Sequence, residues 1–190
     1  MAGLVSAAAA AQLLTHTAPR LGDIRLGVVD GPSGSGKSTF AQAWARACEP
    51  VSSGPVALLS TDLLATWDDP FDWWERLEDS VLRPLSRGRP GRLLANDWST
   101  GVPVPGRLVT IAPPAVLILE GVSAGRWAIA DRVGLLAWLE LPDRVERLRR
   151  AVERDGEASR RFLQQWQDDE DRHFTRDGTK LRADLVVRAS

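Results

Sequence analysis

Short, continuously apolar runs alternate along the chain with longer segments in which apolar residues recur at helical spacing. The apolar runs predict buried strands over 24–29, 56–60, 115–119, 135–141 and 183–187. The other segments predict helices over 4–17, 40–47, 71–85, 126–131, 143–154 and 158–174. Fully apolar strands separated by helices are typical of a parallel sheet covered on both faces. The pattern therefore predicts an α/β fold, a three-layer sandwich with a mainly parallel sheet.

The middle of the chain is less regular. Residues 92–98 fit either a short strand or an extended loop, 102–106 are broken by prolines, and 108–111 fit another short strand. No internal repeat or domain linker is visible, so we expect one domain over 1–190, with 143–160 as a candidate lid region.

One glycine-rich stretch fits the phosphate-loop pattern G-x-x-x-x-G-K-S/T, directly after the first predicted strand and before a predicted helix. Glycines allow backbone N–H groups to turn towards phosphates, and the N-terminus of the next helix adds a positive field. The Lys37 ammonium can follow the β- and γ-phosphates, and the Ser38 hydroxyl is placed to bind Mg²⁺. The stretch therefore predicts a nucleoside triphosphate site made by Gly31, Ser33, Gly34, Ser35, Gly36, Lys37, Ser38 and Thr39.

Two carboxylates follow apolar strands directly. Asp62 comes after the strand at 56–60, and Glu120 ends the strand at 115–119. Ligands of open α/β sheets bind beyond the carboxyl ends of the strands, so both side chains are expected to face the crevice that holds Lys37. Glu120 is a candidate for Mg²⁺, directly or through water, and Asp62 for accepting a proton from a substrate hydroxyl or helping to hold the metal. These roles could be exchanged, and the alternative for each is an acid that caps the next helix or is solvated in a loop.

The predicted helix at 143–154 has two faces. Three arginines at i, i+3, i+7 spacing are what a lid would use to stabilise a transferring phosphoryl group, and Gly156 offers a hinge. The alternative is a solvated arginine face. The apolar face is expected to carry Val145, Leu148 and Val152, and the opposite face Arg147, Arg150 and Arg154.

Tryptophan is abundant, with 8 residues in the chain. Most are expected to pack in the core. One or two could line a substrate pocket and stack on a planar group, because several lie between Asp62 and Glu120: Trp67, Trp73, Trp74 and Trp98.

Composition narrows the choice of partners. The formal net charge of −1 gives no electrostatic case for nucleic acid or an anionic membrane. The single cysteine, Cys48, excludes an internal disulfide or a cysteine-based zinc cluster and fits a reducing compartment. No run approaches the about 18 apolar residues of a membrane span. We expect a cytoplasmic protein whose partner is a small-molecule acceptor; the sequence assigns no oligomeric state.

The chain resembles the uridine kinase / phosphoribulokinase-type branch of P-loop kinases, particularly short bacterial uridine kinase-like proteins. The resemblance runs from about Ile24 to Val187. Beyond the phosphate loop it is carried by Ser60-Thr61-Asp62, Phe71-Asp72-Trp73, Asn96-Asp97-Trp98, Leu117-Ile118-Leu119-Glu120-Gly121, Arg149-Arg150 and Arg154-Asp155.

The resemblance implies a P-loop kinase fold and ATP-dependent phosphotransfer to a hydroxyl, with ATP and Mg²⁺ as the cofactors and a nucleoside-like acceptor favoured. It implies Asp62 as the base, Ser38 and Glu120 around Mg²⁺, and lid arginines on the phosphates, for which the candidates are Arg150 and Arg154. It places Asp97, Trp98 and Trp73 on the substrate side. The alternative function is an ATP-binding regulatory module without small-molecule kinase activity.

Overall fold

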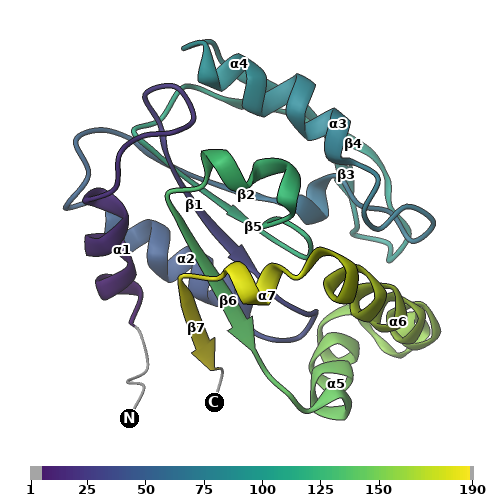
Figure 1. Cartoon of the computed structure of the whole chain (residues 1–190). Helices are drawn as coiled ribbons and strands as arrows, with labels where there is room; N and C mark the ends of the chain where they lie inside the picture. Colours follow the sequence, from purple (N-terminus) through teal and green to yellow (C-terminus); the bar gives the residue numbers. More distant parts are fainter. Residues whose placement is uncertain (1–5, 189–190) are drawn as a thin grey trace.

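The computed structural model describes residues 6–188 and contains a five-stranded parallel sheet (Figure 1). The strand order is β2-β5-β1-β6-β7, and every neighbouring pair is parallel. The predicted mainly parallel α/β sheet is confirmed, and each strand lies within two residues of a predicted apolar run. The strands are β1 (Arg25–Asp30), β2 (Val56–Ser60), β5 (Val116–Glu120), β6 (Leu135–Glu140) and β7 (Leu185–Arg188).

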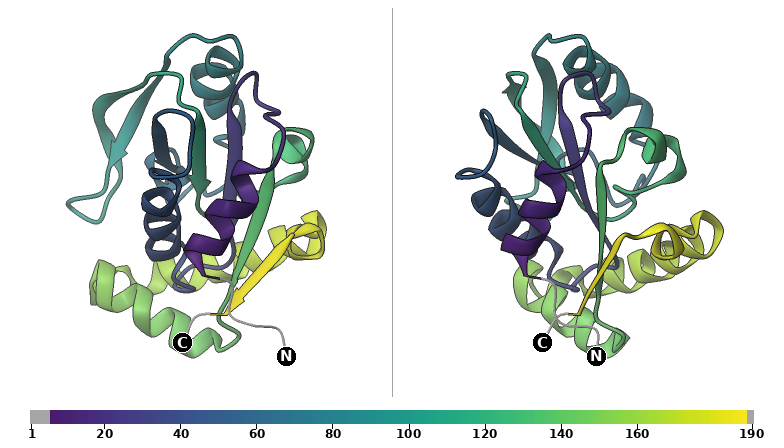
Figure 2. Two further views of the ribbon diagram at one scale, coloured as in Figure 1. Left: turned by 90° about the vertical axis from the view of Figure 1, so that its left-hand side faces the viewer. Right: turned by 60° about the vertical axis from the view of Figure 1, so that its left-hand side comes forward.

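Helices cover both faces of the sheet (Figure 2). The α-helices of the described residues are α1 (Ala7–Thr15), α2 (Lys37–Cys48), α3 (Trp74–Leu77), α4 (Arg83–Ser86), α5 (Arg144–Asp155), α6 (Arg160–Asp177) and α7 (Thr179–Arg182). The start of the predicted helix at 4–17 lies outside the described residues, and the predicted helix at 126–131 is a 3₁₀ helix over Trp127–Arg132.

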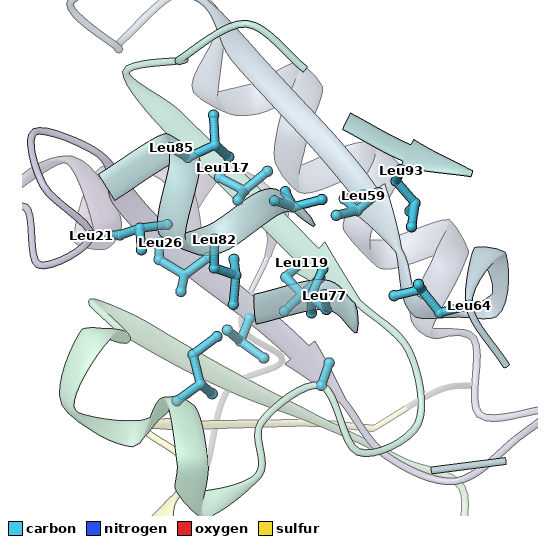
Figure 3. Close-up of a cluster of buried hydrophobic side chains, with 14 of the residues drawn as sticks. Leu21, Leu26, Leu59, Leu64, Leu77, Leu82, Leu85, Leu93, Leu117 and Leu119 are labelled. Carbon is cyan, nitrogen blue, oxygen red and sulfur yellow. The ribbon is translucent and has the colours of Figure 1, made fainter. Parts of the chain in front are cut away.

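Strand β5 shows how the two cores form. Its alternate side chains enter opposite clusters, Ile118 with Trp44 of α2 on one face and Leu117 with Leu77 of α3 on the other. Figure 3 shows Leu117 and Leu77 among the leucines of the second cluster. A strand that is buried on both faces is apolar at nearly every position, which explains why residues 116–119 read as continuously hydrophobic.

The segment predicted as one helix over 71–85 begins at Trp74 and contains a π-helical turn over Glu78–Leu82 between α3 and α4. Here the N–H of Arg83 donates to the carbonyl of Glu78, five residues back. Pro84 follows at once, has no N–H of its own and would crowd an ordinary helical turn. The wider turn lets the helical path continue past this proline.

A β-hairpin forms a separate two-stranded sheet beside the helices. Strands β3 (Gly91–Asp97) and β4 (Val104–Ile111) are antiparallel, so the strand interpretation of 92–98 is confirmed. The prediction that prolines break 102–106 is wrong, because β4 begins at Val104 and includes Pro105. Pro105 is tolerated because it faces Asn96, where the register of the hairpin shifts.

Helix α5 starts beyond the carboxyl end of β6 (Figure 1). Its predicted orientation is partly wrong: Val145 is 78% exposed, while Arg147 is only 6% exposed. The Nη1 atom of Arg147 donates to the carbonyls of Leu141 (2.7 Å) and Pro142 (3.2 Å), which holds this guanidinium inward. Hydrogen bonds to the segment directly before α5 therefore hold Arg147 inward, against the predicted orientation of the helix.

Helix α6 is joined to α5 at its surface. Arg144 of α5 pairs with Asp168 and, at 2.9 Å, with Asp171 of α6. Within residues 6–188, every helix is too short or too polar to span a bilayer.

Leu26 and Leu181 provide a matched test of the core. Leu26 of β1 is 0% exposed, whereas Leu181 of α7 is 91% exposed. We expect Leu26→Ala to lower the free energy of unfolding by about 2–5 kcal/mol, through lost burial and a residual cavity, and Leu181→Ala to change it by less than about 0.5 kcal/mol. Urea denaturation measures both, and equal effects would contradict this placement of the core.

Candidate nucleotide and phosphoryl-transfer site

The sheet register brings three strand ends to one place. Glu120, the last residue of β5, lies opposite Val29 of β1 on one side and Ser60 of β2 on the other. The phosphate loop follows β1, and Asp62 follows β2. The predicted meeting of the loop, Asp62 and Glu120 at the carboxyl edge of the sheet is therefore present in the structure.

The phosphate loop runs into α2 as the pattern predicts. Gly36 precedes α2 with φ 89°, and Lys37 is the first residue of the helix. The buried Lys37 ammonium donates to the carbonyl of Pro32 (3.0 Å). The Ser35 hydroxyl is fully buried, with no hydrogen-bond partner among the described residues. An unpartnered buried donor in this loop fits a site built for phosphate oxygens.

Ser38 and Glu120 face each other across the site. The Ser38 hydroxyl lies 3.3 and 3.4 Å from the two carboxylate oxygens of Glu120, longer than an ordinary hydroxyl–carboxylate hydrogen bond. Burial, followed by the charge of Asp62, raises the pKa of Glu120. A hydroxyl and a carboxylate are oxygen ligands of the kind Mg²⁺ takes, and this ion commonly uses only one or two carboxylates. The pair therefore fits Mg²⁺.

Gly121 allows the turn after β5 to pass close to β2. Its φ is 141°, a conformation that favours glycine, and a Cβ built at this position would overlap the hydroxyl of Thr61. The Glu-Gly strand end is thus a packing requirement as well as a sequence motif. It lets the segment that carries Asp62 lie directly beside Glu120.

Asp62 lies in a 3₁₀ turn over Thr61–Leu63, and its side chain is exposed. Its backbone is held from two sides: its N–H donates to the Ser60 hydroxyl (3.3 Å), and its carbonyl accepts from the indole N–H of Trp98 (2.8 Å). Trp98 comes from the end of the hairpin, so the hairpin positions the turn that carries Asp62. An exposed carboxylate beside Glu120 is accessible to a substrate hydroxyl.

The α5 arginines do not act as one row. Arg147 is turned inward, and the Nε of Arg150 donates to Glu146 (2.7 Å). Arg154 pairs with Asp155 (2.6 Å), and this hydrogen bond is the main cause of the raised pKa of Arg154. The charges of Asp62 and Glu120 raise that pKa further. The electrostatic environment of Arg154 thus includes both strand-end carboxylates.

The substrate-side candidates lie in different environments. Trp98 touches the Asp62 turn, whereas Trp73 is 1% exposed and donates from its indole N–H to Pro70 (2.8 Å). Asp97 is exposed, and a hydrogen bond from the backbone of Ser99 (2.8 Å) lowers the pKa of its carboxyl group. Trp73 therefore packs in the core and presents no surface to an acceptor.

Sequence reasoning missed Asp30, the last residue of β1. Its fully buried carboxylate accepts backbone N–H groups from Gly31 (2.7 Å), Ser123 (2.9 Å) and Gly125 (2.8 Å). Burial raises the pKa of Asp30 to about 7, against the opposing effect of these hydrogen bonds and of Lys37. Asp30 joins the phosphate loop to the loop after β5. Its position directly before the glycine-rich pattern was the available signal.

Sequence reasoning also missed Glu170, in the middle of α6. Its carboxylate accepts the backbone N–H of Ser33 (2.9 and 3.1 Å) and the Ser33 hydroxyl. The two residues are 137 positions apart, and nothing in the spacing of α6 distinguishes Glu170 from its acidic neighbours.

Comparison with known proteins supports the fold. No protein-family model and no curated protein matches this sequence. A Silicibacter sp. TM1040 structure, provisionally described as a fructose transport system kinase, aligns with TM-score 0.73 and 18% identity over 97% of this chain and 99% of that chain. A Bacillus stearothermophilus structure, described as a possible uridine kinase, aligns with TM-score 0.62 and 19% identity over 86% of this chain and 88% of that one. The chain shares the α/β fold of these two structures.

His173 of α6 gives the stability of this region a pH dependence. The ring stacks on Phe71 with centroids 5.0 Å apart, and burial, assisted by the charge of Arg126, lowers its pKa to about 4. In the unfolded chain the His173 ring takes up a proton below about pH 6.5. The contribution of neutral His173 to the free energy of unfolding is therefore fully present above that pH and is lost as the pH falls towards 4.

We expect His173→Phe, which keeps an aromatic ring beside Phe71, to remove this contribution. Between pH 6.5 and 4 the wild-type free energy of unfolding should fall more steeply than that of the variant, by at most the about 1.4 kcal/mol per pH unit of one proton. Urea denaturation across this range measures the difference. Parallel curves would contradict a buried neutral histidine.

Proposed function

We propose that this chain transfers the γ-phosphoryl group of ATP to a hydroxyl of a small-molecule acceptor. The observation that carries the proposal is the convergence at one sheet edge of the phosphate loop, Glu120 opposite Ser38, and the exposed Asp62. Phosphoryl transfer needs mainly a phosphate cradle, a metal position and a group that orients the attacking hydroxyl. This edge offers one residue set for each need.

The phosphate loop and Lys37 would bind the triphosphate. The loop contributes backbone N–H groups and the N-terminus of α2, and Lys37 contributes a positive charge at the first turn of that helix. Ser38 and Glu120 would hold Mg²⁺, which when bound neutralises charge on the phosphate oxygens. ATP and Mg²⁺ are therefore the expected nucleotide and metal.

Asp62 would orient the acceptor hydroxyl and take its proton. Its carboxylate is exposed, while its backbone is anchored by Ser60 and Trp98. Arg154, which is influenced by the charges of Asp62 and Glu120, and Arg150 one turn earlier on α5 would add positive charge near the transferred group.

The acceptor is proposed to be nucleoside-like, with other hydroxylated metabolites second. Trp98 and Asp97, at the hairpin end beside the Asp62 turn, are the proposed acceptor contacts. One structural neighbour is described as a possible uridine kinase, and the other is provisionally described as a fructose transport system kinase. Nucleosides and sugars therefore both belong in the first assay. ADP production with Mg²⁺ should depend on one acceptor class. Slow ATP hydrolysis that no acceptor accelerates would instead favour a regulatory module.

Lys37→Ala tests the phosphate site. We expect a loss of acceptor-dependent ADP production of about 10²-fold or more, because the ammonium is the mobile charge of the loop. Lys180→Ala is the control: it removes the only other lysine of the sequence, whose half-exposed side chain pairs with Glu140. Wild-type turnover in Lys37→Ala would defeat the assignment.

Asp62→Asn separates the base from nucleotide binding. The amide keeps the shape but cannot accept the hydroxyl proton, so kcat should fall about 10²-fold or more while the Kd for ATP changes little. The exposed Asp68→Asn is the matched control and should retain wild-type kcat. An unchanged kcat in Asp62→Asn would remove Asp62 from the role of base.

A further inference from the structure

Glu170 is a buried acid that the proposed chemistry does not use. It is 0% exposed, yet its carboxylate meets the backbone N–H and the hydroxyl of Ser33, inside the phosphate loop. Charged side chains are seldom fully buried unless they have partners. The contact therefore has a reason other than filling space.

Glu170 holds the phosphate loop at Ser33. Its carboxylate accepts both the backbone N–H and the hydroxyl of Ser33, so these two donors already have a protein partner. The buried carboxylate therefore acts on the loop through Ser33. Its two oxygens accept the same N–H at 2.9 and 3.1 Å, which restrains the peptide plane of Ser33.

The charges near Glu170 belong to the loop and to α5. Burial raises the pKa of Glu170, and Lys37, the hydrogen bonds of Ser33 and the charge of Arg147 oppose that rise. The backbone of α5 also reaches the loop: a Cβ on Gly34, whose φ is 75°, would overlap the carbonyl of Arg147. Helices α5 and α6 thus both touch the first half of the phosphate loop.

We propose that Glu170 is a positioning residue that sets the phosphate loop through Ser33 and thereby couples helix α6 to the nucleotide. The inference rests on the proposed function only in taking ATP as the ligand of the loop. Without the carboxylate, two half-buried donors of Ser33 would lose their protein partner, and the loop would rearrange to satisfy them. Because the contact joins the loop to α6, phosphates that order the loop also order the helix.

Glu170→Leu removes both acceptor oxygens and tests the inference by two readouts. Isothermal titration calorimetry should show ATP–Mg²⁺ binding weakened by about tenfold or more. Hydrogen exchange should show that saturating ATP–Mg²⁺ slows the α6 amides of wild type, and that this protection is lost in the variant. Glu170→Gln, which keeps the shape and one acceptor oxygen, should restore most of the affinity and the protection.

Two further variants keep the test informative. Ser33→Ala removes the hydroxyl donor from the loop side without touching α6, and it should weaken both effects in the same direction even if Glu170→Leu folds poorly. Asp169→Leu is the matched control, because the hydrogen bonds of Asp169 to Gln165 and Arg172 stay within α6. It should retain wild-type affinity and protection.

Unchanged affinity, tighter ATP binding or wild-type protection of α6 in Glu170→Leu and Ser33→Ala would each overturn the inference. Tighter binding would mean that the carboxylate competes with a phosphate. A wild-type chain that binds ATP–Mg²⁺ but phosphorylates no acceptor would defeat the proposed function alone, because affinity and hydrogen exchange are measured without turnover.

Discussion

The site depends on the place of β5 between β1 and β2. Parallel pairing on both sides puts Glu120 level with Val29 and Ser60, so the loops after all three strands emerge together. Gly121 then lets the chain turn without striking Thr61. A register slip of one residue would turn the side chains of β5 to the opposite faces and remove Glu120 from the site. The hydrophobic packing that fixes the sheet thus also fixes the distance between Glu120 and Ser38.

The second constraint is electrostatic. The charge of Lys37 acts on three buried carboxylates, Asp30, Glu120 and Glu170, and burial raises the pKa of each. Each also has hydrogen-bond donors: Asp30 and Glu170 accept backbone N–H groups, and Glu120 faces the Ser38 hydroxyl. Asp30 orders the loop after β5, and Glu120 faces the proposed metal position. Glu170 ties the phosphate loop to α6. The phosphate loop is therefore supported by residues on several elements, and its own sequence is only part of the proposed nucleotide site.

The strands, their parallel arrangement and the phosphate loop were predictable because their signals are local: continuous apolar runs, and glycines at fixed spacing before Lys37. The meeting of Asp62 and Glu120 followed from the geometry of parallel sheets. The inward turn of Arg147 was not predictable, because the carbonyls of Leu141 and Pro142 capture it. The role of Glu170 was hidden for a different reason, since its partner Ser33 lies 137 residues away in the sequence.

The central claim is that this sheet edge transfers a phosphoryl group and does not merely hydrolyse or sense ATP. Phosphorus-31 NMR of the wild-type chain with ATP, Mg²⁺ and an accepted substrate follows every phosphorus species at once. The account predicts that ADP and a new phosphomonoester appear in equal amounts, with no excess inorganic phosphate. ADP accompanied only by inorganic phosphate, or no ATP consumption with any nucleoside, sugar or other hydroxylated acceptor, would contradict it.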